Sequence, residues 1–358
     1  MPFLSLSLHN VRNLQNTTID LLSREVYFVG ENGQGKSNLL EALYISAYGS
    51  SFRTRSDAEI VSRGMQDYSI RSFYKDSGGF SNTVTVSFAE NRKRITKNGK
   101  RVADRKEMIN TIPCVLFCHE DLDFASGEPE RRRFFIDQSL SMYDILYIDI
   151  LRRYKKILKS RNLILKEKKY ELLSVYNENL AKEGIEIQRK RIEMIYQFNR
   201  LFTKIYEEVS GIENVSISYD RSWRDMDYEE IMSYLEEKQD MDKKLCTTMS
   251  GPHRDRIRFI KDKQNFITTA STGQKRLISI VLRISQAEYF TKVTGKKPVL
   301  LMDDVLLEMD PEKRRRIMAL LPEYDQLFCT FLPGEPFENY KHSGTRIYLI
   351  EEGKWHEQ

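Results

Sequence analysis

The chain has 358 residues, which is long for a single hydrophobic core and predicts two lobes of ordinary domain size. Its 57 basic and 52 acidic side chains leave a formal charge of +5, an excess too small to identify a partner without its location. No segment approaches the roughly 18 to 20 apolar residues that span a bilayer, and MPFLSLSLHN lacks the features of a signal peptide. We therefore expect a cytoplasmic protein with no membrane partner. Its four scattered cysteines cannot form a disulfide framework and are expected to be buried thiols.

Residues 1–125 are predicted to form strands around one helix. The segments with strand patterns are 3–8, 26–29, 83–88 and 94–101. Asn98-Gly99 predicts a tight hairpin within the last of them, because both residues tolerate positive φ. Residues 38–44 have helical composition and follow the apolar strand 26–29 closely.

Between that strand and that helix lies the stretch GENGQGKS, which matches the phosphate-loop pattern G-x-x-x-x-G-K-[ST]. Its glycines allow backbone N–H groups to face a phosphate, Lys36 can reach the β- and γ-phosphates, and Ser37 can ligate Mg²⁺. A glycine-rich turn without a ligand is the alternative. The predicted nucleotide-binding residues are Gly30, Glu31, Asn32, Gly33, Gln34, Gly35, Lys36, Ser37 and Asn38.

Residues 126–247 are predicted to form a helical arm rich in charge. Between Arg152 and Lys169 there are nine basic side chains and one acidic one, Glu167, so the segment could bind nucleic-acid phosphates. A solvated helix face is the alternative. The candidate DNA-binding residues are Arg152, Arg153, Lys155, Lys156, Lys159 and Arg161. A second candidate surface surrounds the predicted hairpin and comprises Arg63, Arg92, Lys93, Arg94, Lys97 and Lys100.

Residues 248–358 return to a strand pattern and contain a predicted helix from Thr272 to about Thr291. The apolar run 299–302 then ends in Asp303 and Asp304. A strand that ends in carboxylates suits a phosphate loop, because Asp303 can help hold Mg²⁺ while Asp304 positions or deprotonates the attacking water. Taken alone, the two aspartates could equally form an ordinary turn.

The order of the motifs resembles that of ABC-type ATPase heads, in which a phosphate loop precedes a long insertion, an S-x-G-Q helix start and a strand ending in acids. This resemblance implies an α/β head built from both chain ends, with the helical arm inserted between them. It also implies that Ser271 and Gly273 cap the γ-phosphate held by Lys36 of a second copy, so that ATP joins a homodimer, and Gln274 is a further nucleotide-binding candidate.

Within that class the chain resembles the RecF family of bacterial DNA replication and repair ATPases along nearly its whole length. The matching segments include Asn10-x-Arg12-Asn13, GENGQGKSNLLEALY, Ser51-x-Arg53-Thr54, Phe117-x-x-Glu120-Asp121-Leu122, Gly127-x-Pro129 and Gly251-Pro252-His253-Arg254-Asp255. The resemblance implies ATP and Mg²⁺ as cofactors, single-stranded and duplex DNA at gaps or junctions as substrate, and RecO and RecR as partners in loading RecA. It further implies that Arg53 reaches the nucleotide and that hydrolysis is weak and stimulated by DNA.

The chain departs from the family pattern at a few positions. His119 stands where the family usually has proline, and Arg256 where it has an acidic residue. The γ-phosphate sensor stays unassigned, with Thr330 as the candidate. Asp304 stands for the usual catalytic glutamate and is one methylene shorter, so we expect slow turnover.

Three other classes of P-loop protein are weighed against this interpretation. A transporter motor usually carries a glutamine after its first lobe, and Phe117-Cys118-His119-Glu120 lacks one. A structural SMC-type head needs hundreds of heptad residues, which this insertion is too short to supply. A metabolic kinase has no use for the segment 271–274.

Overall fold

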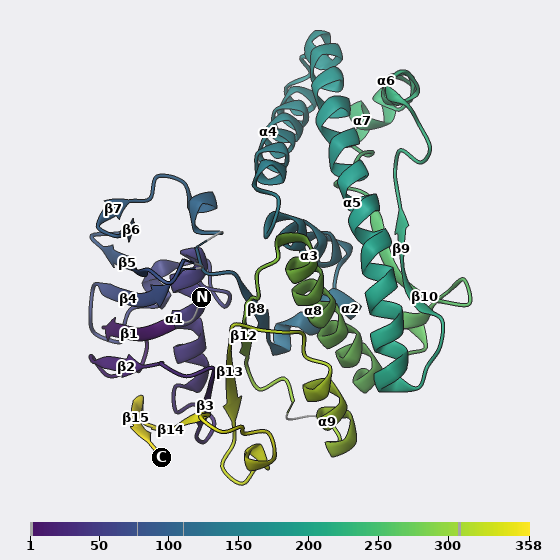
Figure 1. Cartoon of the computed structure of the whole chain (residues 1–358). Coiled ribbons are helices and arrows are strands. Elements are labelled where there is room, and N and C mark those ends of the chain that lie inside the picture. The colour runs from purple at the N-terminus through teal and green to yellow at the C-terminus, as the bar shows by residue number, and fades with distance from the viewer. Residues whose placement is uncertain (1–2, 77, 110, 307–308) are drawn as a thin grey trace. The chain divides into compact units, whose positions relative to one another are not determined.

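We describe a computed structural model of the chain, which covers residues 3–76, 78–109, 111–306 and 309–358 (Figure 1). The chain divides into two compact units. The head unit comprises the residues up to Asp121 together with Leu282–Gln358, and the arm unit comprises Leu122–Val281. The predicted boundary at residue 248 is therefore wrong, because residues 248–281 belong to the arm unit. The reason is that their strand Arg256–Lys261 pairs with the strand Val215–Asp220 of the insertion.

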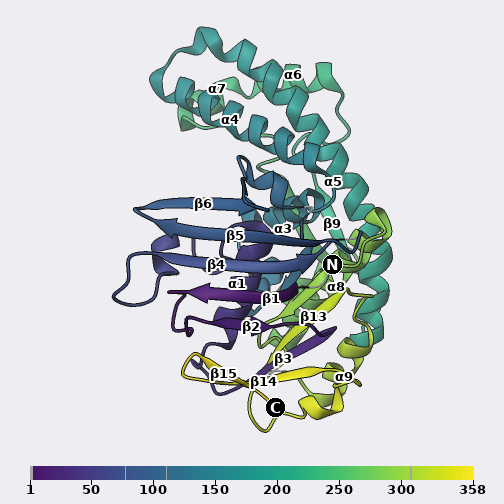
Figure 2. The ribbon, with the colours of Figure 1, turned by 60° about the vertical axis from the view of Figure 1, so that its left-hand side comes forward.

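The head unit contains an antiparallel sheet in the order β2-β1-β4-β5-β6-β7 (Figure 2). Its strands are β1 (Phe3–His9), β2 (Thr18–Asp20), β4 (Tyr68–Lys75), β5 (Ser81–Ala89), β6 (Arg92–Lys97) and β7 (Lys100–Arg101). Alternate residues of β5 are buried, as the pattern at 83–88 predicts, and β4, which the sequence analysis did not identify, shows the same alternation. The predicted hairpin is confirmed between β6 and β7, where Asn98 and Gly99 both have positive φ.

The second sheet of the head unit has the order β15-β14-β3-β13-β12-β8. Its strands are β3 (Glu25–Val29), β8 (Cys114–Phe117), β12 (Val299–Met302), β13 (Gln326–Phe331), β14 (Arg346–Glu351) and β15 (Lys354–Glu357). All of them run parallel except β15, and every residue of β3, β8, β12 and β13 is buried. Helix α1 (Lys36–Tyr48) shares one hydrophobic core with both sheets through Leu39, Leu40 and Leu43.

The arm unit is mainly helical, as predicted. Its helices are α2 (Leu122–Ser126), α3 (Pro129–Ser141), α4 (Ile145–Glu167), α5 (Leu173–Ser210), α6 (Tyr228–Glu237) and α7 (Gln239–Leu245). Its small sheet has the order β11-β10-β9, formed by β9 (Val215–Asp220), β10 (Arg256–Lys261) and β11 (Gln264–Asn265). Helix α8 (Thr272–Thr294) crosses the boundary between the units, and α9 (Pro311–Ala319) lies in the head unit. Short 3-10 turns are η1 (Asp57–Glu59), η2 (Arg105–Met108), η3 (His119–Asp121), η4 (Tyr170–Leu172), η5 (Phe266–Thr268) and η6 (Phe337–Asn339).

Cys114, Cys118 and Cys329 are buried free thiols, as expected, whereas Cys246 is only half-buried because it ends α7 in a left-handed turn. Among the described residues, no helix combines the length and the apolar character that crossing a membrane requires.

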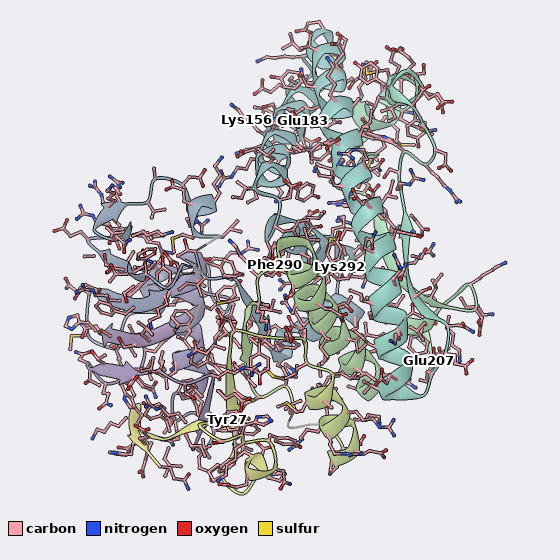
Figure 3. The ribbon with its side chains drawn as sticks, in the orientation of Figure 1. Tyr27, Lys156, Glu183, Glu207, Phe290 and Lys292 are labelled. Atoms are coloured by element: carbon pink, nitrogen blue, oxygen red, sulfur yellow. The ribbon has the colours of Figure 1, made fainter. Side chains whose placement is uncertain are left out.

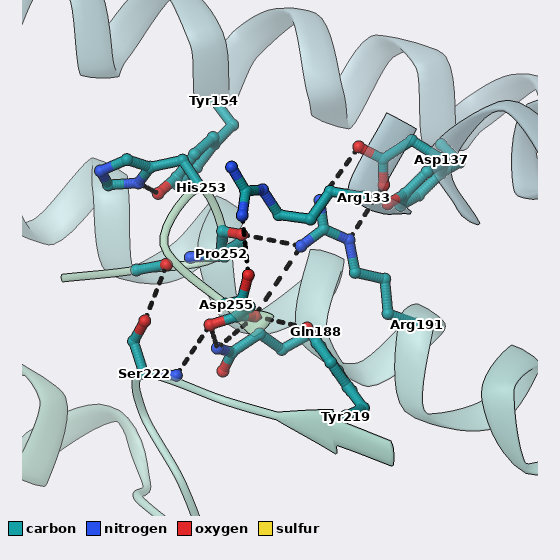
Figure 4. Close-up of polar contacts among 12 residues, drawn as sticks. Arg133, Asp137, Tyr154, Gln188, Arg191, Tyr219, Ser222, Pro252, His253 and Asp255 are labelled. Atoms are coloured by element: carbon teal, nitrogen blue, oxygen red, sulfur yellow. Dashed lines mark hydrogen bonds and ion pairs between the residues drawn. The ribbon is translucent and has the colours of Figure 1, made fainter. Parts of the chain in front are cut away.

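A buried polar cluster surrounds the stretch Gly251–Asp255 in the arm unit (Figure 4). The Asp255 carboxylate is 1% exposed and accepts hydrogen bonds from Gln188 Nε2 at 2.9 and 3.0 Å, from the Ser222 N–H at 2.7 Å and from the Tyr219 hydroxyl. Helix α5, strand β9 and the loop after β9 thereby converge on one carboxylate, which is stabilised because its oxygens are fully engaged.

Two arginines extend this cluster. Arg191 donates to both carboxylate oxygens of Asp137 at 2.9 Å and to the Pro252 carbonyl at 2.8 Å. Arg133 donates to the Asp255 carbonyl at 2.8 Å. The side chains of α3 and α5 therefore fix the backbone of the 251–255 loop as well as its carboxylate.

His253 lies in the same cluster and is held at both ring nitrogens. Its Nδ1 lies 2.7 Å from the Tyr154 hydroxyl, and its Nε2 lies 3.1 Å from the Thr248 carbonyl. Because a carbonyl only accepts, Nε2 carries the proton and Nδ1 accepts from Tyr154. Burial, with help from the nearby Arg254 and Arg133 cations, lowers the pKa of His253 to about 4.

We expect His253 to make the folded protein acid-sensitive. The unfolded chain takes up this proton near pH 6.5 and the folded chain only near pH 4, so the neutral imidazole stabilises the fold above pH 6.5 and this stability is lost as the pH falls. Between pH 7 and pH 5 the loss is about 2 kcal/mol. Urea unfolding at both pH values should show that difference between the unmodified chain and His253→Gln. An identical pH dependence in the two proteins would contradict the assignment.

Candidate functional site

The phosphate loop leaves the end of β3 and enters α1, as the sequence predicts. Gly33 and Gly35 have φ of 80° and 117°, a backbone conformation that suits glycine. Gly35 is the N-cap of α1 and no side chain caps the helix there. The first N–H groups of α1 are therefore available to an anion, which the positive end of the helix also favours.

Lys36 lies in the interior of this loop and is 4% exposed. Its Nζ donates to the carbonyls of Gly30 at 2.7 Å and Glu31 at 3.0 Å. Two backbone carbonyl dipoles thus hold the ammonium group, and neither of these partners carries a negative charge. A phosphate in the loop would supply the negative charge that no described residue places beside this buried cation.

Ser37 and Asp303 form the contact that joins the two ends of the chain at the site. Ser37 Oγ donates to Asp303 Oδ1 at 2.7 Å, although the residues are 266 positions apart. Asp303 directly follows β12, which is parallel to β13, and β13 is parallel to β3. Burial raises the pKa of Asp303 to about 6, against the opposing effect of the Ser37 hydrogen bond. A hydroxyl and a carboxylate oxygen are ligands that fit Mg²⁺.

Asp304 and Thr330, predicted separately as catalytic group and candidate sensor, contact each other. Thr330 Oγ1 donates to Asp304 Oδ1 at 2.7 Å and accepts from the Asp304 N–H at 2.8 Å. Asp304 has a φ of 52°, which is uncommon for a residue with a side chain. The buried hydroxyl of β13 therefore fixes both the backbone and the carboxylate of Asp304.

A second polar cluster beside the loop centres on Glu41, which the sequence reasoning did not select. The Glu41 carboxylate is 1% exposed and accepts from Arg12 Nε and Nη2, both at 3.0 Å, and from the Ser51 hydroxyl. Arg53 lies 3.7 Å from Glu41 and donates to Asn38 Oδ1 at 2.6 Å. The sequence signal was a lone acid in the apolar stretch LLEALYISAY.

The predicted in-trans residues lie at the start of α8. The Gln274 N–H donates to Ser271 Oγ at 3.3 Å and the Ser271 N–H donates to Gln274 Oε1 at 2.7 Å, which forms a capping box. Ser271 and Gly273 are exposed, and a Cβ built on Gly273 would meet nothing within 4 Å. The helix start is therefore preorganised and accessible to another molecule.

The candidate DNA-binding residues of α4 separate into three groups. Lys155, Lys156 and Lys159 are exposed. Arg152 and Arg153 are exposed as well, but Arg152 lies 3.7 Å from Asp149 and Arg153 forms a bidentate pair with Glu183 of α5. Figure 3 labels Lys156 on α4 and Glu183 on α5.

Arg161, the sixth candidate, differs from the others because its side chain is fully buried. It donates to Asp242 at 2.7 Å, to Asn177 at 2.8 Å and to Thr248 at 2.8 Å. Such a residue supports the packing of the arm unit and is not presented to a phosphate backbone. We therefore remove Arg161 from the candidate DNA-binding surface and keep its exposed members Arg152, Arg153, Lys155, Lys156 and Lys159.

The comparisons with known proteins agree with this geometry. A family model described as RecF/RecN/SMC N terminal domain matches residues 3–355. The DNA replication and repair protein RecF of Treponema pallidum is 49% identical over 350 residues, covering 97% of this chain and 99% of that protein. The chain belongs to the RecF family. The RecF of Leptospira interrogans is 31% identical over 362 residues, covering 98% of this chain and 97% of that protein.

Solved structures place this RecF-family chain among ABC-type heads. The recombination mediator protein RecF with ATP, from the RecFOR pathway, matches with a TM-score of 0.90 and 27% identity over 100% of this chain and 97% of that chain. An Smc head bound to the C-winged helix domain of ScpA matches with a TM-score of 0.59 and 15% identity, which shows the fold alone. The predicted α/β P-loop head is confirmed.

Proposed function

We propose that this RecF-family protein binds ATP and Mg²⁺ at the phosphate loop and uses them to control a DNA-bound dimer. The observation that carries the proposal is the 2.7 Å hydrogen bond between Ser37 and Asp303, which brings two oxygen ligands together beside the buried Lys36. The solved structure of RecF with ATP, at 27% identity, supports the same choice of nucleotide.

Each side chain of the site then has a separate task. Lys36 holds the β- and γ-phosphates, and Ser37 and Asp303 would hold the metal, which supplies charge neutralisation when bound. Asp304, fixed by Thr330, orients or deprotonates water. Because the carboxylate is short and already accepts a hydrogen bond from Thr330, we infer slow hydrolysis that resets the dimer.

The exposed start of α8 supports the proposed dimerisation. Ser271, Gly273 and Gln274 would contact the γ-phosphate held by a second copy, where the helix N-terminus adds its positive end. The dimer would act in the cytoplasm on single-stranded and duplex DNA at gaps or junctions. With RecO and RecR as partners, it would help to load RecA. The family membership supports these partners, and the exposed lysines of α4 support the DNA contact.

We expect ATP, more than ADP, to convert monomers to dimers, because only the γ-phosphate can be shared between Lys36 of one copy and Ser271 of the other. Lys36→Met should weaken nucleotide binding itself. Ser271→Arg should leave nucleotide binding intact and abolish the dimer. Sedimentation and a nucleotide-binding assay measure both, and normal dimerisation of Ser271→Arg on ATP would exclude the in-trans role.

Asp304→Asn should slow hydrolysis about 100-fold or more while nucleotide affinity stays unchanged, since a general base acts in the chemical step. The asparagine Oδ1 can still accept from Thr330, so the local geometry is kept. The ATP dimer should persist longer on DNA. Asp303→Asn, the matched control, should instead weaken Mg²⁺-dependent binding. Equal reductions of nucleotide affinity in the two variants would show that the roles are not separate.

Replacing Lys155, Lys156 and Lys159 together by alanine should weaken DNA binding with little regard to sequence. The slope of log affinity against log salt should fall by roughly 0.9 for each DNA phosphate that the variant no longer neutralises. Binding at several salt concentrations, with ATP present, measures the slope. If the variant dimerises and keeps its slope, the DNA-binding surface lies elsewhere, and the hairpin variant Arg94, Lys97 and Lys100 to alanine is the next comparison.

A further inference from the structure

The turn between β14 and β15 meets the phosphate loop at its tip. The Glu352 N–H donates to Gln34 Oε1 at 2.6 Å, and the Gly353 N–H donates to the Gln34 carbonyl at 2.9 Å. Both the side chain and the backbone of Gln34 are therefore directed toward this turn and away from the interior of the loop.

The same turn also contacts the segment that precedes the loop in sequence. The Gln15 N–H donates to the Gly353 carbonyl at 2.9 Å. Asn13 Nδ2 lies 3.4 Å from the carbonyls of Gly33 and Gln34, and Asn13 Oδ1 accepts from Asn38 Nδ2 at 2.7 Å. The phosphate loop is thus enclosed between residues 13–15 and the turn at 351–354.

The close approach requires glycine at two positions. A Cβ on Gly353 would lie 1.8 Å from the Asn13 carbonyl oxygen, and a Cβ on Gly30 would lie 2.4 Å from the Ile350 carbonyl oxygen. Both clashes are with backbone, which cannot rotate away as a flexible side chain can. Gly353 also has a φ of 76°, so it serves the turn and the close approach together.

We propose that the β14–β15 turn is a positioning element for nucleotide binding. It contacts the phosphate loop through Gln34 and so keeps the loop backbone in the conformation that binds an anion. By engaging the Gln34 carbonyl and side chain, the turn leaves the N–H groups of the loop directed toward the phosphates. Nucleotide affinity then depends on residues more than 300 positions from the loop, outside every motif that contacts the nucleotide. The inference rests on the proposed binding of ATP by this loop.

The experiment compares Gly353→Ala with Gly344→Ala. Gly344 precedes the first residue of β14, Arg346, and has a φ of 92°, yet a Cβ there would meet nothing within 4 Å. Both variants therefore carry similar backbone strain, but only Gly353→Ala places a Cβ against Asn13 and so pushes the β14–β15 turn away from the phosphate loop. Titration with a fluorescent ATP analogue should show affinity reduced about tenfold or more in Gly353→Ala and changed less than about twofold in Gly344→Ala.

Amide hydrogen exchange without nucleotide separates a local role from general destabilisation. In Gly353→Ala the amides of residues 31–38 should exchange faster, while those of β4 and β5 keep the rates of the control. If Gly353→Ala does not fold, Gln34→Ala serves instead, because it removes only the acceptor of the Glu352 N–H. Gln34→Glu keeps that acceptor and should restore slow exchange.

The outcomes distinguish the two proposals. If the unmodified chain fails to bind the ATP analogue, the proposed function is wrong. If the unmodified chain and Gly344→Ala bind it and Gly353→Ala binds equally well with unchanged loop exchange, the positioning role of the turn is wrong while the proposed function stands.

Discussion

The hydrogen bond from Ser37 to Asp303 is the interaction on which the head unit's site depends. The two residues are 266 positions apart, and they meet because β12, β13 and β3 are neighbouring parallel strands in one sheet. The carboxyl ends of parallel strands lie at the same edge, so a loop after β3 and an acid after β12 necessarily converge there. Any insertion between them is tolerated provided that this strand register is kept, which explains how a helical arm can interrupt an ATPase head.

The sequence was sufficient for the parts of this site whose chemistry is local. The spacing of the glycines identifies the phosphate loop. The apolar run 299–302 identifies the buried strand that ends in Asp303 and Asp304. The contact between Thr330 and Asp304 was not predictable, since it depends on the register of two strands. The same holds for Glu41, whose two arginines come from separate loops, and for Gly353, whose role is visible only as a distance to Asn13.

The arm unit shows why a charge count along a sequence overstates a binding surface. Arg161 is fully buried against Asp242, and Arg191 is buried against Asp137 within the Asp255 cluster. Burying such charges is costly unless each finds its partner, so these pairs fix how α4 packs on α7 and how α5 packs on α3 more than they add to stability. A pattern of basic residues at helical spacing cannot separate these buried arginines from their exposed neighbours.

What remains of the basic run on α4 is mostly lysine. Arg152 lies 3.7 Å from Asp149, Arg153 is paired with Glu183 and Arg161 is buried, which leaves Lys155, Lys156 and Lys159 as the exposed cations of the candidate set without an ion pair among the described residues. Lysine offers a mobile point charge and arginine a planar fork, so a lysine surface suits phosphates in many geometries more than the edge of one particular base. A surface of this kind favours contacts with the phosphate backbone of DNA. In the dimer that we propose, selection of a particular DNA structure would come from the spacing of two such surfaces, which ATP would set.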